Sequence, residues 1–251
     1  DRNRTSPFAF TGNKFEFRMV GSSASIAEAN IVLNTIVADE LKQFADALEG
    51  AENFRHAVME LIRRTVREHK RILFNGNNYS EEWRREAQRR GLLNLASTAE
   101  AIPRFLDPKN IALFARHGIF SETEMRSRCE ILLENYHKTV LIEALTMLDM
   151  ARHDVVPAVV EYTSRLADGI LKKRAVGAHI ACELEENLLS RLSSLSSALD
   201  TQIRALDAAV YGAREVHGNE ALALYCRERV LAAMRELRGV VDALEAGAAD
   251  F

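Results

Sequence analysis

The sequence has few of the residues that cross-link a chain or turn it sharply. Its 251 residues include three cysteines, four prolines and twelve glycines. So few turn-forming residues exclude a protein built from many short strands. The cysteines stand far apart and are odd in number, so neither a zinc ribbon nor a disulfide framework is indicated. We expect a chain that works in a reducing cytoplasm.

Long hydrophobic runs and an excess of one charge are also missing. No apolar run approaches the roughly 18 residues that a membrane span needs, and the first residues do not read as a signal peptide. The 33 basic and 36 acidic side chains give a formal net charge of −3, which argues against a general nucleic-acid binder. We therefore expect no membrane and no nucleic-acid partner. The opening residue, Asp1, suggests a fragment of a longer protein.

What the sequence contains instead is helical periodicity. Ser80 is a predicted N-cap, Gly91 a predicted helix end, and Ser121 with Glu124 a capping box. Pro157 is expected to kink or break the helix that starts at residue 121. From residue 178 to about 213 the apolar residues form one stripe. Their spacings along the sequence are 4, 4, 3, 4, 4, 3 and 4 residues, which favours a nearly straight packed helix. Its members are Leu184, Leu188, Leu192, Leu195, Leu199, Ile203, Leu206 and Val210.

The fold class follows from these patterns. We predict a mainly α chain, with long antiparallel helices packed as a bundle and a short N-terminal β-hairpin. The sequence pattern divides the chain into three segments. Residues 1–20 are rich in turn-forming residues, residues 21–120 predict helices of moderate length, and residues 121–251 predict longer, more regular helices. The final helix is expected over residues 219–246.

The hairpin segment carries the clearest candidate for chemistry. Strands over F-A-F and K-F-E-F-R-M are expected on either side of a Thr-Gly-Asn turn. Side chains alternate along a strand, so Lys14, Glu16 and Arg18 share one face, with a carboxylate between two cations. This face suits Mg²⁺ and phosphate or carboxylate groups, and the hairpin can bring Arg4 alongside. The same pattern also fits a solvent-facing strand held by salt bridges.

Four longer motifs resemble one family. NRTSPFAFTGNKFEFR resembles the end of the catalytic domain of glutamine synthetases. The later motifs resemble the C-terminal region of the type III glutamine synthetases: EHKRILFNGNNYSEEWRREAQRRGLLNL, NIALFARHGIFSETEMRSRCEILLENY and IEALTMLDMARHDVVPAV. The resemblance covers essentially the whole chain. It implies that residues 1–20 end the catalytic domain, that 21–120 continue it as helices, that 121–251 form a helical extension, and that the full-length parent is α+β.

The resemblance also implies roles for four residues. Glu16 matches a carboxylate that holds Mg²⁺ or Mn²⁺ against the phosphates of ATP. Arg18 matches the arginine that binds the glutamate substrate near its reacting carboxylate. Arg4 matches an arginine at the transferred phosphoryl group, and Lys14 stands where relatives place an arginine near the ATP phosphates. The implied reaction is ligation of ammonia to L-glutamate through γ-glutamyl phosphate, in a large homo-oligomeric ring assembly.

The chain also departs from the family pattern. Relatives carry a second arginine a few residues after the Asn-Arg pair, where this chain has SPFAF. The usual Asn-Pro-Tyr after the strand is replaced by SSASIAEANIVLN. Everything that the family places before the Asn-Arg motif is missing, including the other metal-binding glutamates. We therefore expect this chain to be inactive alone, because one carboxylate cannot assemble a two-metal site.

Other features of the sequence leave rival interpretations open. The long striped helices fit a non-catalytic oligomerisation or interaction module, and both functions can hold together. A basic cluster on the predicted second helix is interpreted as a solvated face or an intersubunit contact; its members are Arg63, Arg64, Arg67, Lys70 and Arg71. The seven histidines show no metal-ligand spacing. Cys129, Cys182 and Trp83 are expected to pack in a core or interface.

Overall fold

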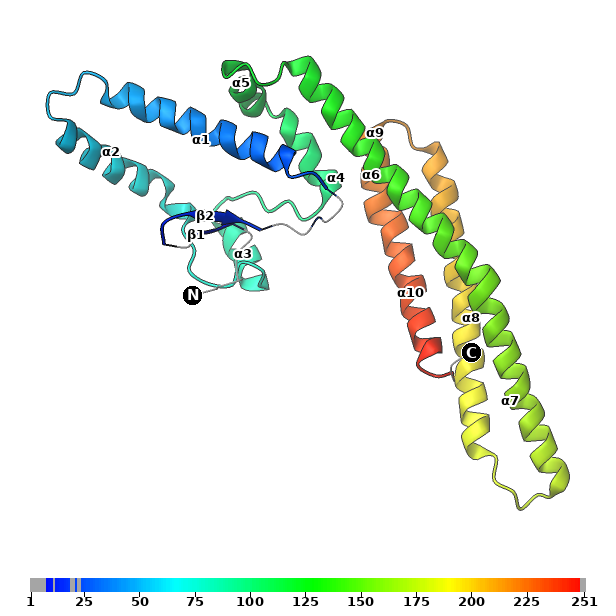
Figure 1. Ribbon diagram of the computed structural model, residues 1–251. Helices are drawn as coiled ribbons and strands as arrows, with labels where there is room; N and C mark the ends of the chain where they lie inside the picture. Colours follow the sequence, from blue (N-terminus) through cyan, green and yellow to red (C-terminus); the bar gives the residue numbers. More distant parts are fainter. Residues whose placement is uncertain (1–7, 11, 19–20, 22–23, 249–251) are drawn as a thin grey trace. The chain divides into compact units, whose positions relative to one another are not determined.

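The computed structural model describes residues 8–10, 12–18, 21 and 24–248. Two compact units divide the chain: residues 1–96 with 105–125, and residues 97–104 with 126–251. Figure 1 shows the helices and the short hairpin of these units. The described chain is overwhelmingly helical, which confirms the mainly α prediction. No helix among the described residues is long and apolar enough to cross a bilayer.

The first unit begins with the hairpin of β1 (Phe8–Phe10) and β2 (Phe15–Phe17), which pair antiparallel. Gly12 supplies the turn at a φ of 97°, a left-handed conformation that favours glycine. The helices of the unit are α1 (Ala27–Leu48), α2 (Phe54–His69), α3 (Glu81–Arg89) and α5 (Pro108–Arg116). A single 3₁₀ turn, Lys70–Ile72, follows α2. The hairpin prediction is confirmed.

Local signals set the helix ends as the sequence predicts. The Ser80 hydroxyl accepts from the Trp83 amide at 3.3 Å, and Gly91 ends α3 at a φ of 67°. Ser121 and Glu124 form the predicted capping box, with the Ser121 amide donating to the Glu124 carboxylate at 2.7 Å. These contacts satisfy backbone groups that the first and last turns of a helix leave unpaired.

The second unit is built on three long helical stretches. The first runs through α6 (Glu122–Met150), a π-helical turn (Ala151–Val155) and α7 (Val156–Val176), the second is α8 (Glu183–Gly212), and the third runs through α9 (Asn219–Tyr225), a π turn (Cys226–Val230) and α10 (Leu231–Glu245). The short α4 (Thr98–Ala101) and a 3₁₀ turn (Ile102–Leu106) precede them. The expected bundle is thus confirmed.

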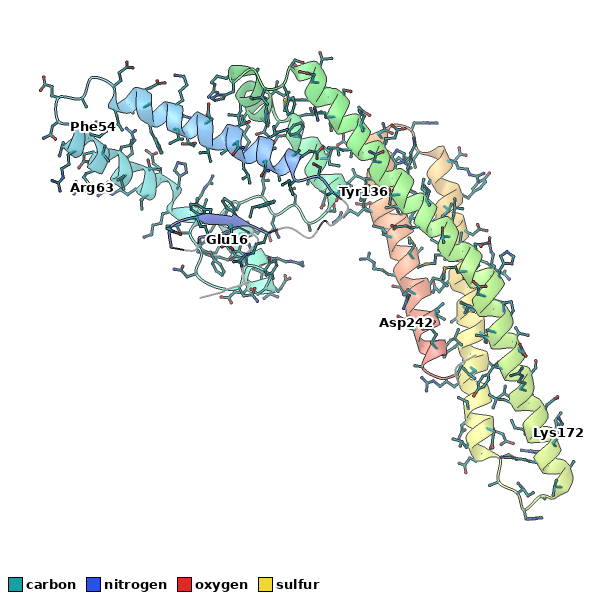
Figure 2. All side chains as sticks on the ribbon, in the orientation of Figure 1. Glu16, Phe54, Arg63, Tyr136, Lys172 and Asp242 are labelled. Carbon is teal, nitrogen blue, oxygen red and sulfur yellow. The ribbon has the colours of Figure 1, made fainter. Side chains whose placement is uncertain are left out.

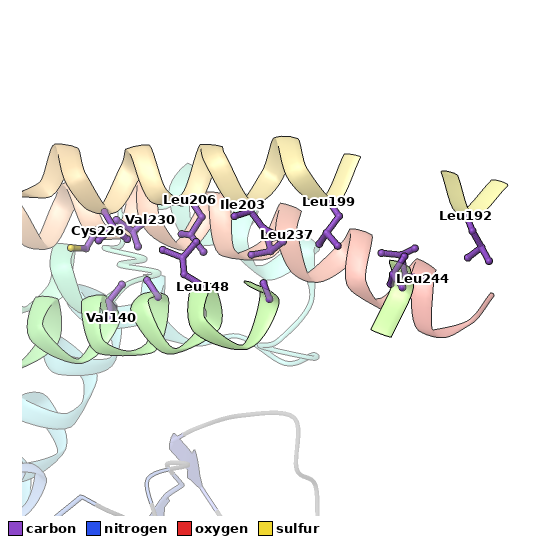
Figure 3. Packing of buried hydrophobic residues seen from close by; sticks show 14 residues of the cluster. Val140, Leu148, Leu192, Leu199, Ile203, Leu206, Cys226, Val230, Leu237 and Leu244 are labelled. Carbon is purple, nitrogen blue, oxygen red and sulfur yellow. The ribbon is translucent and has the colours of Figure 1, made fainter. Parts of the chain in front are cut away.

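The core of this unit confirms most of the predicted stripe on α8. Leu192, Leu199 and Leu206 are at most 1% exposed and pack with residues of the other two stretches (Figure 3). Cys129, Cys182 and Cys226 are free and buried, as expected of core thiols. Burial raises the pKa of the Cys226 thiol to about 11, which disfavours the reactive thiolate.

One prediction in this unit was wrong. Leu184 is 78% exposed, because α8 begins at Glu183, five residues after the predicted start, and leaves Leu184 in the first turn. Pro157 was predicted to kink or break its helix. The α-helical pattern of α6 is interrupted after Met150, but the helix does not end there, since α7 continues to Val176. The interruption is a π-helical turn over Ala151–Val155, which ends two residues before Pro157, and kinks and bulges of this kind occur next to prolines within α-helices.

Candidate functional site

The hairpin sorts its side chains onto two faces. Phe8 lies opposite Phe17, and Ala9 lies opposite Glu16. The Phe8 ring stacks on the Phe15 ring at 5.2 Å and meets the Phe17 ring at 6.3 Å. Because strand residues alternate, this aromatic face leaves the charged residues on the opposite face. All three rings are between 46% and 62% exposed.

The opposite face holds the predicted triad of charges. Arg18 donates from Nη2 to Oε2 of Glu16 at 2.8 Å, and Lys14 Nζ lies 3.5 Å from Oε1 of the same carboxylate. The Glu16 side chain is 36% exposed, and Figure 2 shows it on the hairpin. The prediction that these three side chains lie together on one face is thus confirmed. Arg4 lies outside the described residues, and the roles of all four residues stay predictions.

Electrostatics keep the central carboxylate ionised. The hydrogen bond from Arg18 holds the pKa of Glu16 below its ordinary value, and the charges of Arg18 and Lys14 act in the same direction. An ionised carboxylate is the kind of oxygen ligand that Mg²⁺ and Mn²⁺ prefer. Glu16 therefore fits the role of one metal ligand.

The described part of the chain does not hold a complete metal site. Across its 8–10, 12–18, 21 and 24–248 stretches, no group of three or more His, Cys, Asp or Glu side chains is placed to bind an ion. Glu16 can serve only alongside ligands from outside these residues. In this arrangement Glu16 can supply one ligand to a metal–phosphate centre, and Lys14 and Arg18 can neutralise negative charge beside it.

Sequence reasoning did not single out two further polar contacts of the first unit. Asp39 on α1 accepts from Arg116 at 2.7 Å and lies 2.9 Å from Nε2 of His117. Its contact with His117 is the main cause that holds the pKa of Asp39 below its ordinary value. Arg90 donates to the carbonyls of Arg71 and Leu73, at 3.0 and 2.7 Å. Both contacts join residues far apart in sequence, which no local pattern indicates.

Comparison with known proteins relates this sequence to one family. The family described as "Glutamine synthetase C-terminal domain" matches residues 57–174. Over 98% of the chain, it is 41% identical to a glutamine synthetase of Butyrivibrio fibrisolvens and 36% identical to the type-3 glutamine synthetase of Dictyostelium discoideum. It is 34% identical, again over 98% of the chain, to a glutamine synthetase of Bacteroides fragilis.

The chain spans about a third of the length of these relatives, between 34% and 35% of each. The matches nevertheless take in almost all of the chain, including sequence on both sides of the stretch that the family domain matches. The chain therefore belongs to the glutamine synthetase family, as a C-terminal portion of such a protein.

Proposed function

We propose that the full-length protein is a glutamine synthetase that ligates ammonia to L-glutamate with ATP. The observation that carries the proposal is the ionised Glu16 carboxylate held between Lys14 and Arg18 on one strand face. The relatives' names support the ligase class. In the proposed reaction the γ-carboxylate of glutamate attacks the terminal phosphorus of ATP and ADP leaves. Ammonia then attacks the γ-glutamyl phosphate, phosphate leaves, and a proton is lost.

Each residue of the triad has a role in this proposal. Glu16 supplies one ligand to Mg²⁺ or Mn²⁺, which neutralises charge on the transferred phosphoryl group when bound. Arg18 binds the substrate carboxylate, because a guanidinium can donate two parallel hydrogen bonds to it. Lys14 and Arg4 neutralise charge on the phosphates of ATP. The remaining ligands come from the part of the full-length protein outside this chain.

The second unit supports a further role as an assembly element. Its three helical stretches enclose a continuous apolar core along most of α8. Such a bundle is stable without catalytic residues, so the unit can help to organise a homo-oligomer, proposed as a ring, in the cytoplasm. A non-catalytic interaction module is thereby the second candidate function, and it is compatible with the first.

A ligase assay separates the two candidates. The full-length protein, identified by an intact mass well above 28.1 kDa, should form glutamine, ADP and phosphate in equal amounts from glutamate, ammonia and ATP. The 251-residue chain alone should form none. A full-length protein that hydrolyses no ATP with glutamate and ammonia present would leave the interaction module as the function.

A further inference from the structure

Residues 97–104 belong to the second unit, although the chain on both sides of them belongs to the first. We call residues 97–104 the strap. It contains α4 and the start of the 3₁₀ turn that follows it, and α4 packs against α9 of the bundle. The chain therefore enters the second unit at residue 97, leaves it after residue 104 and returns to it at residue 126.

The strap lies against a small set of buried residues. Ala99 of the strap and Ala223 of α9 are both 0% exposed, and Leu133 and Cys129 of α6 are 2% and 3% exposed. None of these four is among the described residues of the apolar cluster that fills the bundle. The Cys129 thiol donates to the carbonyl of Ile102 at 3.7 Å, so it contacts the strap directly.

The helix of the strap depends on contacts with the bundle. Isolated helices shorter than about 12–15 residues are at best marginally stable in water, and α4 has four residues. The Ser97 hydroxyl accepts from the Glu100 amide at 3.3 Å and donates to Oε2 of the Glu100 carboxylate at 2.8 Å. Oε1 of the same carboxylate lies 3.1 Å from Nη1 of Arg227, in the π turn that follows α9. Glu100 thus joins the cap of α4 to its docking contact.

The bundle has contacts of its own that do not involve the strap. At the start of α9, Asn219 contacts α6, and at its end Tyr225 donates to a carbonyl of α8. The apolar cluster runs along all three helical stretches. A segment held by few contacts on such a scaffold opens at a lower free-energy cost than the scaffold itself.

We propose that the strap is a conformational device with two states, and that Glu100 controls the change between them. In the docked state α4 is folded against α9, Ala99 and Cys129 are buried, and Glu100 is paired with Arg227. In the detached state α4 is unfolded while the bundle stays folded. Because both ends of the strap continue into the first unit, detachment releases these two chain segments from the bundle.

The Cys129 thiol can measure the state of the strap. It is buried, and burial raises its pKa, so a thiol reagent reacts with it only when the strap opens. Cys226 is 0% exposed within the apolar cluster and serves as an internal control. The experiment treats the 251-residue chain with iodoacetamide at about pH 8.5, where thiolates form, and follows each cysteine by mass spectrometry of its peptides.

Three variants weaken the docked state without changing Cys129. Glu100→Ala removes both the cap contact and the ion pair, and should speed labelling of Cys129 about tenfold. Arg227→Ala removes only the ion pair and should speed it about threefold. Ala99→Glu places a charge in the buried contact and should speed it at least about a hundredfold.

Two controls separate detachment of the strap from unfolding of the bundle. Asp207→Ala removes an ion pair with Arg152, which also joins two helical stretches, and should leave the labelling rate of Cys129 unchanged. In every variant the labelling rate of Cys226 should equal that of the unaltered chain. Circular dichroism should remain almost the same, because detachment unfolds only the four residues of α4.

Three results would overturn the proposal. If Cys129 of the unaltered chain reacts as fast as a cysteine in an unfolded peptide, no docked strap covers it. If Glu100→Ala speeds labelling equally at Cys129 and Cys226, the whole bundle unfolds and the strap has no separate state. If neither Glu100→Ala nor Ala99→Glu changes the labelling rate of Cys129, the strap does not control access to this thiol.

Discussion

The amide of Asn219 contacts the ring of His137, although 82 positions separate the two residues. Oδ1 of Asn219 lies 3.0 Å from Nε2 of His137, and Nδ2 donates to the Glu130 carboxylate at 2.7 Å. An ionised carboxylate only accepts, so Glu130 fixes the orientation of the amide. Nε2 of His137 is therefore the protonated ring nitrogen, and its N–H donates a hydrogen bond to Oδ1 of Asn219. This chain of contacts ties the start of α9 to α6 inside the second unit.

Removing Asn219 should destabilise this unit. His137 is only 6% exposed, so Asn219→Ala leaves a donor without its partner in a place that water reaches poorly. We expect a loss of about 1–3 kcal/mol in the free energy of unfolding, measured by urea denaturation. Ser197→Ala, at an exposed serine of α8, is the matched control and should change it by less than about 0.5 kcal/mol. Equal effects of the two substitutions would contradict the role of the contact.

The corrected stripe on α8 gives a second test. Leu206 is 0% exposed and Leu184 is 78% exposed, although the sequence places both on one stripe. Leu206→Ala should lower the free energy of unfolding by about 2–5 kcal/mol, because it removes buried surface and leaves a cavity. Leu184→Ala should change it by less than about 0.5 kcal/mol. A large effect at Leu184 would mean that this residue is buried after all.

Glu86 should make the local stability around Trp83 depend on pH. Hydrogen bonds from Arg89 and Arg90 lower the pKa of Glu86 from 4.5 to about 2. A carboxyl whose pKa is depressed on folding stabilises the fold above its unfolded pKa, and this contribution is lost as pH falls through the folded value. The relevant window therefore runs from 4.5 down to about 2.

The fluorescence of Trp83 can measure this pH dependence of local stability. It is the single tryptophan, its ring lies 4.5 Å from that of Phe74, and the Arg90 guanidinium lies 5.8 Å from the same Phe74 ring. The midpoint of unfolding can be followed by Trp83 fluorescence. Glu86→Gln should lower this midpoint at about pH 6, and the difference in midpoint between the variant and the unaltered chain should shrink toward about pH 3. Glu82→Gln on the same helix is the control. A difference that stays constant across this range would show that the Glu86 contacts do not titrate.

The sequence predicted best where structure depends on neighbours along the chain. The Ser80 cap, the Gly91 end and the Ser121 capping box involve residues three or four positions apart, so their patterns are sufficient. The charged face of the hairpin follows equally from the alternation of a strand. The grouping of Lys14, Glu16 and Arg18 was therefore predictable from the sequence.

Prediction was poorer where the outcome depends on packing. The sequence does not show that a π turn comes before Pro157. Whether the helix breaks or bulges at this point depends on how it packs against the surrounding helices. The contact of Asn219 with His137 and that of Asp39 with Arg116 join separate helices, and no local spacing encodes them. The metal-binding role predicted for Glu16 stays a prediction, because no group of three or more metal-ligating side chains stands among the described residues.

The most direct test of the central claim is the effect of Glu16→Gln on glutamine formation by the full-length protein. Gln keeps the size of the side chain but removes the negative charge that a divalent cation requires. We expect the rate to fall by about a hundredfold or more at saturating Mg²⁺, with the oligomeric state unchanged and Glu28→Gln, an exposed acid of α1, fully active. A Glu16→Gln protein that forms glutamine at the unaltered rate would contradict the account, because this strand would then supply no metal ligand.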